Sequence, residues 1–325
     1  MSHGEKKYGI GVDLGGTKIM VGVVDLESGK VLASARKKTH AERGEKAIVE
    51  RVNKMIHEAL ETANLPPDEA VTGIGVGVAG QLDRKKGVIL SSPNIPFDHF
   101  PLAEQIQDEF HLPVTLANDV EAAAYGELFH GAGKGNPLFV CVFVGTGIGG
   151  GIVQDGKLYR GASGTGGELG HMTVVAGGRI CGCGSRGCLE AYSSRTAMTH
   201  VIAAEIKRGR HSAVKQELEA DGGVLRSGMI AEAIQAGDEL VIEVAREAAE
   251  YLGYGLASII NFYNPQKIIL GGGVIEALDL IYEHATRRAR EIALPPPAQV
   301  VEFSRTELGD DAGTVGAATL ASAAR

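Results

Sequence analysis

Two stretches of the chain share one pattern, in which an apolar strand and a glycine-rich loop are followed by a second apolar strand. The first stretch covers residues 8–25 with its loop at 14–17, and the second begins at residue 138 with its loop at 145–151. Amphipathic segments such as 238–263 separate the strands, which is typical of an α/β protein. The repeated pattern therefore predicts a duplicated α/β architecture, with two lobes and a cleft between them.

The boundary between the two lobes is expected near Asn118. No proline- or serine-rich linker marks it, but a short apolar strand ends at this point and a helix follows. We therefore expect a small lobe at 1–118 and a large lobe at 119–310, which carries the later glycine clusters.

Composition excludes several classes of protein. At 325 residues and 44% hydrophobic content, the chain can bury the cores of about two domains. Its net charge of −8 argues against a nucleic-acid-binding body, which normally carries a basic patch. No apolar run reaches transmembrane length, and the N-terminus has no apolar signal-peptide region. We therefore expect a soluble cytoplasmic protein that binds neither nucleic acid nor membrane.

Three of the four cysteines lie close together in one stretch. Cys181, Cys183 and Cys188 follow His171 within eighteen residues, and glycines between the cysteines allow tight turns. Three thiolates and one imidazole are the ligands of a closed, structural zinc site. The alternatives are three unligated buried cysteines beside an unrelated histidine, or a disulfide, which Cys-x-Cys spacing would strain.

The loop Asp13-Leu14-Gly15-Gly16-Thr17-Lys18 joins the first two strands. Its glycines bring backbone N–H groups close to a bound anion, and Asp13 is suited to hold Mg²⁺ directly or through water. The alternative is a tight hairpin with glycine in its turn.

The second loop, Gly145-Thr146-Gly147-Ile148-Gly149-Gly150-Gly151, matches the dinucleotide-binding pattern G-x-G-x-x-G. That fingerprint requires a helix after the loop, whereas the residues from Ile152 have the pattern of a strand. We therefore interpret the loop as a second phosphate clamp. A third cluster, Gly271-Gly272-Gly273, lies between a strand and a helix, and the three together suggest one bound nucleotide.

Asp119 begins a predicted helix at the expected lobe boundary. It could simply cap this helix, or it could accept a hydroxyl proton during phosphoryl transfer. The polar side chains of Asn94, Glu168 and Glu190 are suited to hydrogen-bonding a polyhydroxylated ligand.

In this order, the motifs resemble the ROK family of bacterial sugar kinases, and within it the glucokinases. The resemblance covers essentially the whole chain, and it is most specific in Glu168-x-Gly170-His171 and in the cysteine stretch that ends at Glu190. The glycine loops are shared more widely with actin-like ATPases. The other matching motifs are the Asp13–Lys18 loop, Ser92-Pro93-Asn94, Asn118-Asp119, 145–151, 271–273 and Asp310-Asp311-Ala312-Gly313.

The resemblance implies a two-lobed actin-like (ribonuclease H-like) fold that binds ATP, Mg²⁺ and a hexose, with the C-terminal helix 311–325 completing the small lobe. Asp119 would be the catalytic base at the sugar 6-hydroxyl, and His171 would contact both sugar and zinc through different ring nitrogens. The implied sugar-binding residues are Asn94, Asn118, Asp119, Glu168, His171 and Glu190. The implied ATP- and Mg²⁺-binding residues are Asp13, Gly15, Gly16, Thr17, Lys18, Gly145, Thr146, Gly147, Gly149, Gly271, Gly272 and Gly273.

Several alternatives remain open at the level of sequence. The stretch 91–97 is most similar to glucokinases and favours glucose, with fructose, N-acetylglucosamine and N-acetylmannosamine as the other acceptors. ROK repressors carry an N-terminal helix-turn-helix domain, and we expect none here because the first loop begins at Asp13. A sugar sensor with an inactive kinase site is a further alternative, and the family implies a homodimer or higher homo-oligomer.

Overall fold

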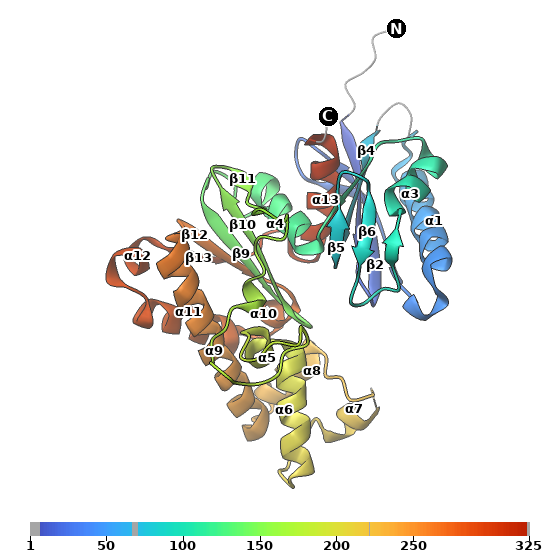
Figure 1. Cartoon of the computed structure of the whole chain (residues 1–325). Helices are drawn as coiled ribbons and strands as arrows, with labels where there is room; N and C mark the ends of the chain where they lie inside the picture. Colours follow the sequence, from blue (N-terminus) through green and yellow to red (C-terminus); the bar gives the residue numbers. More distant parts are fainter. Residues whose placement is uncertain (1–6, 67–70, 221, 324–325) are drawn as a thin grey trace. The chain divides into compact units, whose positions relative to one another are not determined.

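The computed structural model describes residues 7–66, 71–220 and 222–323, which form two compact units (Figure 1). Unit 1 comprises the described residues up to Gly135 together with those from Asp310 onward, and unit 2 runs from Asn136 to Gly309. Each unit is built around a five-stranded sheet, and unit 1 also contains a sheet of three short strands.

The main sheet of unit 1 has the strand order β3-β2-β1-β4-β8. Neighbouring strands from β3 to β1 pair antiparallel, and those from β1 to β8 pair parallel. The strands are β1 (Tyr8–Leu14), β2 (Lys18–Asp25), β3 (Val31–Lys38), β4 (Val71–Val78) and β8 (Val114–Ala117). The small sheet has the order β5-β6-β7, with β5 (Gln81–Asp83), β6 (Val88–Ser91) and β7 (Asp98–Phe100).

Helices cover both faces of this sheet. The alternating residues Ile10 and Val12 of β1 belong to the apolar core shared with α1 (Glu45–Ala63) and α3 (Leu102–Phe110). On the opposite face, a Cβ atom at Gly11 would collide with the Thr314 carbonyl of α13 (Ala312–Ala323). Glycine at this position therefore lets the C-terminal helix lie directly on the sheet.

The helix α4 (Asp119–His130) belongs to unit 1, so the division lies at Gly135 and not near Asn118 as expected from the sequence. The physical reason is its close packing on α13, where a Cβ atom at Gly316 would collide with the Ala122 carbonyl. The boundary therefore follows helix packing and not the end of β8.

The sheet of unit 2 has the order β11-β10-β9-β12-β13, with antiparallel pairs from β11 to β9 and parallel pairs from β9 to β13. Strand order and directions thus repeat those of unit 1, as the duplicated sequence pattern predicted. The strands are β9 (Phe139–Val144), β10 (Ile148–Gln154), β11 (Lys157–Leu158), β12 (Lys267–Gly271) and β13 (Glu302–Arg305).

The core of unit 2 is dominated by α9 (Glu239–Tyr263) and α11 (Asp279–Ile292), whose buried side chains pack with those of β9 and β12. The chain is 3₁₀-helical at 41–43, 169–171 and 309–311. The remaining helices of unit 2 are α5 (Glu190–Ser193), α6 (Arg195–Lys207), α7 (Lys215–Ala220), α8 (Ser227–Gln235), α10 (Gly273–Ala277) and α12 (Pro295–Val300). Among the helices that the structure describes, none combines the length and the apolar character needed to cross a bilayer.

The prediction of a loop over 145–151 is wrong in its second half, because β10 begins at Ile148 and includes Gly149, Gly150 and Gly151. Leu169 packs against Gly150 so closely that a Cβ atom there would overlap its side chain. Gly150 therefore admits a neighbouring segment to the strand surface, and Gly149–Gly151 pair with β9 instead of forming a loop. The last strand, β13, begins at Glu302, two residues after α12 ends at Val300.

Candidate active site

Asp119 is placed by the junction between β8 and α4. Asn118 is the N-cap of α4, and its Oδ1 accepts hydrogen bonds from the backbone N–H groups of Val120 and Glu121 at 3.0 and 3.3 Å. The Glu121 carboxylate completes a capping box by accepting from the Asn118 N–H at 3.4 Å. The cap is therefore made by Asn118, and Asp119 is the first helical residue, with Oδ1 3.0 Å from the N–H of Val120.

A buried ion pair holds this capping box in place. Arg84, just after β5, donates to Glu121 Oε2 at 2.6 Å, and the Glu121 side chain is only 7% exposed. The pair ties the start of α4 to the small sheet, in which Asn94 lies between β6 and β7. The sequence did not point to Arg84, although the spacing of Asn118 and Glu121 is that of a capping box.

Asp13 lies near Asp119 at the end of β1. Burial and, to a smaller extent, the charge of Asp119 raise the pKa of the Asp13 carboxyl to about 6, although the charge of Lys18 opposes this shift. Two neighbouring carboxylates are unfavourable unless a proton or a cation compensates them. The structure thus brings together two of the predicted site residues in an arrangement suited to a divalent cation.

The predicted phosphate loop of unit 1 is a tight connection between β1 and β2. The N–H of Gly15 donates to the Lys18 carbonyl at 3.0 Å, and a Cβ atom at Gly16 would lie 2.6 Å from the Cβ atom of Asn94. Asn94 therefore packs against this loop. Lys18, predicted as an ATP ligand, forms an ion pair with Asp310 at 3.3 Å, so its charge is shared with the start of the C-terminal helix.

The four predicted zinc ligands converge in unit 2. One donor atom from each of His171, Cys181, Cys183 and Cys188 lies within 4.8 Å of all the others, and the cysteines are free of disulfides. His171 Nδ1 is 3.7 Å from Cys181 Sγ, and the sulfurs of Cys183 and Cys188 are 3.8 Å apart. A tetrahedron with metal–sulfur bonds of about 2.3 Å has sulfur–sulfur edges of about 3.8 Å, so these residues fit a zinc ion.

The chemistry of the donor set agrees with this geometry. Burial raises the pKa of the Cys181 thiol to about 12, so a cation next to the sulfur is what would hold it as a thiolate at neutral pH. Gly187 adopts φ 83°, and a Cβ atom there would collide with the Val175 carbonyl. A larger residue at 187 would therefore move Cys188 away from the other three donors.

Protein contacts also anchor the zinc loop, which we define as residues 171–190. The guanidinium of Arg179 lies 4.6 Å from the centre of the Tyr192 ring and donates to Glu247 at 2.9 Å. The N–H of Arg179 donates to the Tyr192 hydroxyl at 2.7 Å. The sequence did not indicate these contacts, because they join residues far apart in the chain.

The predicted sugar-binding residues of unit 2 surround this loop. His171 Nε2 lies 4.0 Å from Glu168 Oε2, while Nδ1 lies 3.7 Å from Cys181 Sγ, so the two ring nitrogens have different neighbours. Glu190 Oε2 accepts from the Ile148 N–H at 2.8 Å, and Oε1 lies 3.6 Å from Cys181 Sγ. Glu190 therefore connects the zinc loop to the glycine loop 145–147.

The second and third glycine clusters lie side by side. Gly272 has φ 87°, and a Cβ atom there would lie 2.6 Å from the Val144 carbonyl at the end of β9. Arg195 and Thr196, at the start of α6, also contact the glycine loop, and both donate side-chain hydrogen bonds to Thr146 at 2.7 Å. The sequence did not single out Arg195 or Thr196, because nothing in their local pattern shows which loop α6 adjoins.

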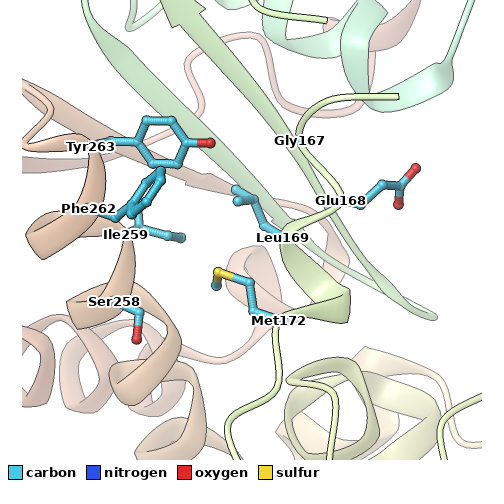
Figure 2. A pocket seen from close by; sticks show the side chains of 8 residues that line it. All are labelled: Gly167, Glu168, Leu169, Met172, Ser258, Ile259, Phe262 and Tyr263. Carbon is cyan, nitrogen blue, oxygen red and sulfur yellow. The ribbon is translucent and has the colours of Figure 1, made fainter. Parts of the chain in front are cut away.

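A pocket of about 430 Å³ lies behind the Glu168–His171 segment. Figure 2 shows Leu169 and Met172 directed toward Phe262 and Tyr263 of α9, whereas the Glu168 carboxylate points away from these rings. The lining is mainly apolar, so the pocket does not suit a polyhydroxylated ligand. The predicted sugar-binding groups thus lie outside the pocket, apart from Glu168 at its edge.

The predicted site residues are divided between the units. Unit 1 contains Asp13, Gly15, Gly16, Thr17, Lys18, Asn94, Asn118 and Asp119, and unit 2 contains Gly145, Thr146, Gly147, Gly149, Glu168, His171, Cys181, Cys183, Cys188, Glu190, Gly271, Gly272 and Gly273. Within each unit, the structure brings members of the set into contact.

Comparisons with known proteins extend over nearly the whole chain. The sequence profile of the ROK family matches residues 9–324. The glucokinase of Thermotoga maritima is 33% identical over 96% of each chain. The crystal structure of a ROK family glucokinase from Streptomyces griseus in complex with glucose and AMPPNP matches with a TM-score of 0.82 at 35% identity, over 96% of this chain and 98% of that one. The predicted fold class is thereby confirmed.

The relatives also include transcriptional regulators. The xylose repressor of Bacillus subtilis is 29% identical over 96% of this chain and 76% of its own length. Similarity alone therefore relates the chain to both enzymes and repressors, and the site residues must distinguish between them.

Proposed function

The chain belongs to the ROK family, and we propose that it is a sugar kinase that transfers a phosphoryl group from ATP to the 6-hydroxyl of glucose. Full-length similarity to glucokinases at 33–35% identity supports this assignment. The choice of glucose among hexoses follows from the same similarity together with the residues at 91–97.

The observation that carries the proposal is the proximity of Asp13 and Asp119. A protein that only binds a sugar has no need of a half-buried carboxylate whose pKa a neighbouring aspartate raises. A phosphotransferase uses one carboxylate to hold a divalent cation and another to accept a proton. The pair therefore favours a kinase over a sensor or a repressor.

Asp119 is the general base in this proposal. Its carboxylate accepts the proton of the sugar 6-hydroxyl as that oxygen bonds to the γ-phosphorus and the bond to the ADP oxygen breaks. The capping box and the Arg84–Glu121 pair hold the backbone of Asp119 in a fixed place. Positioning of this kind accounts for much of the rate enhancement in phosphoryl transfer.

The sugar hydroxyls are bound by neutral and acidic side chains. Asn118 uses Oδ1 in the helix cap, so its amide nitrogen is the group that would donate to a hydroxyl. Glu168 and Glu190 are acceptors, and His171 presents Nε2. The proposed sugar ligands are Asn94, Asn118, Asp119, Glu168, His171 and Glu190.

The nucleotide and its cation are assigned to the glycine loops and to Asp13. The loops at 15–17, 145–147 and 271–273 offer backbone N–H groups for phosphate oxygens, apart from those of Gly15 and Gly145, which donate within their own loops. Asp13 would hold Mg²⁺, which when bound neutralises charge on the phosphates. Zinc is structural, since four protein donors leave no open coordination position.

Initial rates with ATP and Mg²⁺ test the proposal, with glucose, fructose, mannose, N-acetylglucosamine and N-acetylmannosamine as acceptors. We expect kcat/KM for glucose to exceed the others by at least about tenfold, because a missing hydrogen bond to a charged group costs about 1.5–3 kcal/mol. The Asp119→Asn variant supplies the background. A preference for an acetamido sugar would support the kinase function but show that glucose is not the preferred substrate. Hexose binding without turnover would show that the protein is a sensor.

A further inference from the structure

In the glycine loop of unit 2, the backbone carbonyls and the backbone N–H groups differ in whether they have hydrogen-bond partners. The Gly145 carbonyl accepts from the N–H of Arg195 at 2.9 Å, and the Thr146 carbonyl accepts from the Thr196 hydroxyl at 2.7 Å. In contrast, no hydrogen bond among the described residues engages the N–H groups of Thr146 or Gly147. The start of α6 therefore satisfies the acceptors of the loop and leaves two donors for another group.

Arg195 adds a positive charge at the same place. Its Nη2 donates to the Thr146 hydroxyl at 2.7 Å, and no ion pair among the described residues includes it. Burial lowers the pKa of the Arg195 guanidinium, which means that its charge is partly desolvated. A desolvated cation is unfavourable without an anion nearby, and the chain as a whole is acidic with a net charge of −8.

Arg208, the C-cap of α6, is an arginine whose charge is fully compensated, in contrast to Arg195. Its side chain is 76% exposed and donates to Glu205 at 2.6 Å, so protein and solvent both compensate its charge. Arg195 has neither a carboxylate partner nor full exposure. The two arginines therefore differ in how their charges are compensated, and of the two, Arg195 is the one that contacts a glycine loop.

The space beside the loop suits an anion. A Cβ atom at Gly145 would meet no atom within 4 Å, whereas one at Gly147 would meet the Glu190 carboxylate. The loop is therefore open on the Gly145 side and closed by a carboxylate on the Gly147 side. A guanidinium offers several N–H donors in a planar fork, which matches the oxygens of a phosphate group.

We propose that Arg195 binds the phosphate chain of the nucleotide, together with the N–H groups of Thr146 and Gly147. This inference rests on the proposed kinase function, and it adds a residue that recognises the phosphates of both ATP and ADP. Because these contacts exist before transfer, the side chain acts on nucleotide affinity more than on kcat.

Titration calorimetry with ADP tests the proposal without requiring sugar turnover. Arg195→Gln is expected to weaken ADP binding by about 10- to 100-fold, in line with the loss of one hydrogen bond to a charged group. Arg195→Lys keeps the charge and is expected to lose less. Arg208→Gln on the same helix is the matched control and is expected to bind ADP as the unaltered protein does.

Kinetics separate phosphate binding from a general structural role. Arg195→Gln should raise the KM for ATP by a similar factor and leave the KM for the sugar within about twofold. Equal ADP affinity in Arg195→Gln and the unaltered protein would overturn the proposed role of Arg195 but not the kinase function. The same conclusion would follow from equal losses of ADP affinity in the Gln and Lys variants, or from a parallel rise in the KM values for ATP and sugar. An unaltered protein that binds no ADP would overturn the kinase function as well.

Discussion

The surroundings of Asp119 and the zinc loop are built in opposite ways. Asp119 lies between a strand and a helix, and a capping box and a buried ion pair fix its backbone. Between His171 and Glu190, the described chain has only the end of a 3₁₀ turn and isolated bridges at Thr173–Cys188 and Ile180–Arg186. A regular strand–helix junction therefore holds the first region. The second region is held by turn and bridge hydrogen bonds, such as that from the Gly187 N–H to the Arg179 carbonyl at 2.8 Å, together with side-chain contacts.

The electrostatics of the two regions also differ. Asp13 and Asp119 are like charges whose proximity raises the pKa of Asp13. In the zinc loop, four donors that fit a cation converge, so binding a metal stabilises the local structure. One region brings like charges together within regular secondary structure, and the other brings cation-binding donors together within an irregular loop. Three substitutions test this contrast.

The largest expected effect is that of Asp119→Asn. The amide cannot accept the hydroxyl proton, so kcat should fall by about 10²- to 10⁴-fold. Because Asn118 makes the cap, the thermal midpoint should stay close to that of the unaltered protein. Because an amide can still hydrogen-bond a hydroxyl, the affinity for sugar measured by calorimetry should change much less than kcat. A variant with near-normal kcat would refute the role of Asp119, and a large fall in thermal midpoint would refute the claim that the cap is independent of it.

An intermediate effect is expected for Cys183→Ala. Loss of one of four donors should remove the zinc and raise the KM for the sugar by about tenfold or more, because the loop carries His171 and Glu190. Amide hydrogen exchange should increase in the zinc loop and remain unchanged in α4.

The matched control for this variant is Cys141→Ala, which removes the buried cysteine that lies outside the cluster. Zinc measured by elemental analysis should stay at one equivalent in the control and disappear in Cys183→Ala. If the zinc-free variant keeps its sugar KM, then the backbone hydrogen bonds of the loop and the contacts of Arg179 suffice to hold it, and the contrast between the two regions fails.

The smallest effect concerns the charge of Asp13. Its pKa is raised from 3.8 to about 6 by burial and then by Asp119, so the folded state holds the proton more tightly than the unfolded chain does. The resulting stabilisation is complete below pH 3.8 and is lost as the pH rises through about 6. Asp13→Asn should therefore be more stable than the unaltered protein at pH 8, by about 1–2 kcal/mol, with little difference near pH 4.

Urea unfolding at the two pH values, without nucleotide or divalent cations, measures this difference. Asp108→Asn, on the exposed face of α3, is the control and should change stability by less than about 0.5 kcal/mol at either pH. A loss of stability in Asp13→Asn at pH 8 would show that the Asp13 carboxylate stabilises the fold. This result would contradict the interpretation of Asp13 and Asp119 as an unfavourable pair of like charges.

Several features were predictable because the physical signal is local. Three such features depend on residues close together in the chain. They are the apolar strands on either side of glycine, the long helix capped by Asp238, and the four donors within eighteen residues. These patterns were sufficient for the duplicated α/β fold and for the convergence of His171, Cys181, Cys183 and Cys188. The resemblance to ROK proteins added roles that local rules do not supply, such as that proposed for Asp119.

Other features depended on contacts between distant segments. The division at Gly135 follows the packing of α4 on α13. Gly149–Gly151 form a strand by pairing antiparallel with β9, and Leu169 packs on this strand at Gly150. The Arg84–Glu121 pair and the Arg195–Thr146 hydrogen bond join residues that no short pattern relates.

The sequence by itself determined most of the elements and the set of side chains proposed to carry chemistry, because periodicity, capping and ligand spacing act over a few residues. Only the tertiary structure decided which charges have partners. Lys18 is neutralised by Asp310, and Glu121 by Arg84, whereas Arg195 reaches the glycine loop without a carboxylate. The physical reason is that charge compensation depends on distance and burial, and the fold sets both between residues far apart in the chain.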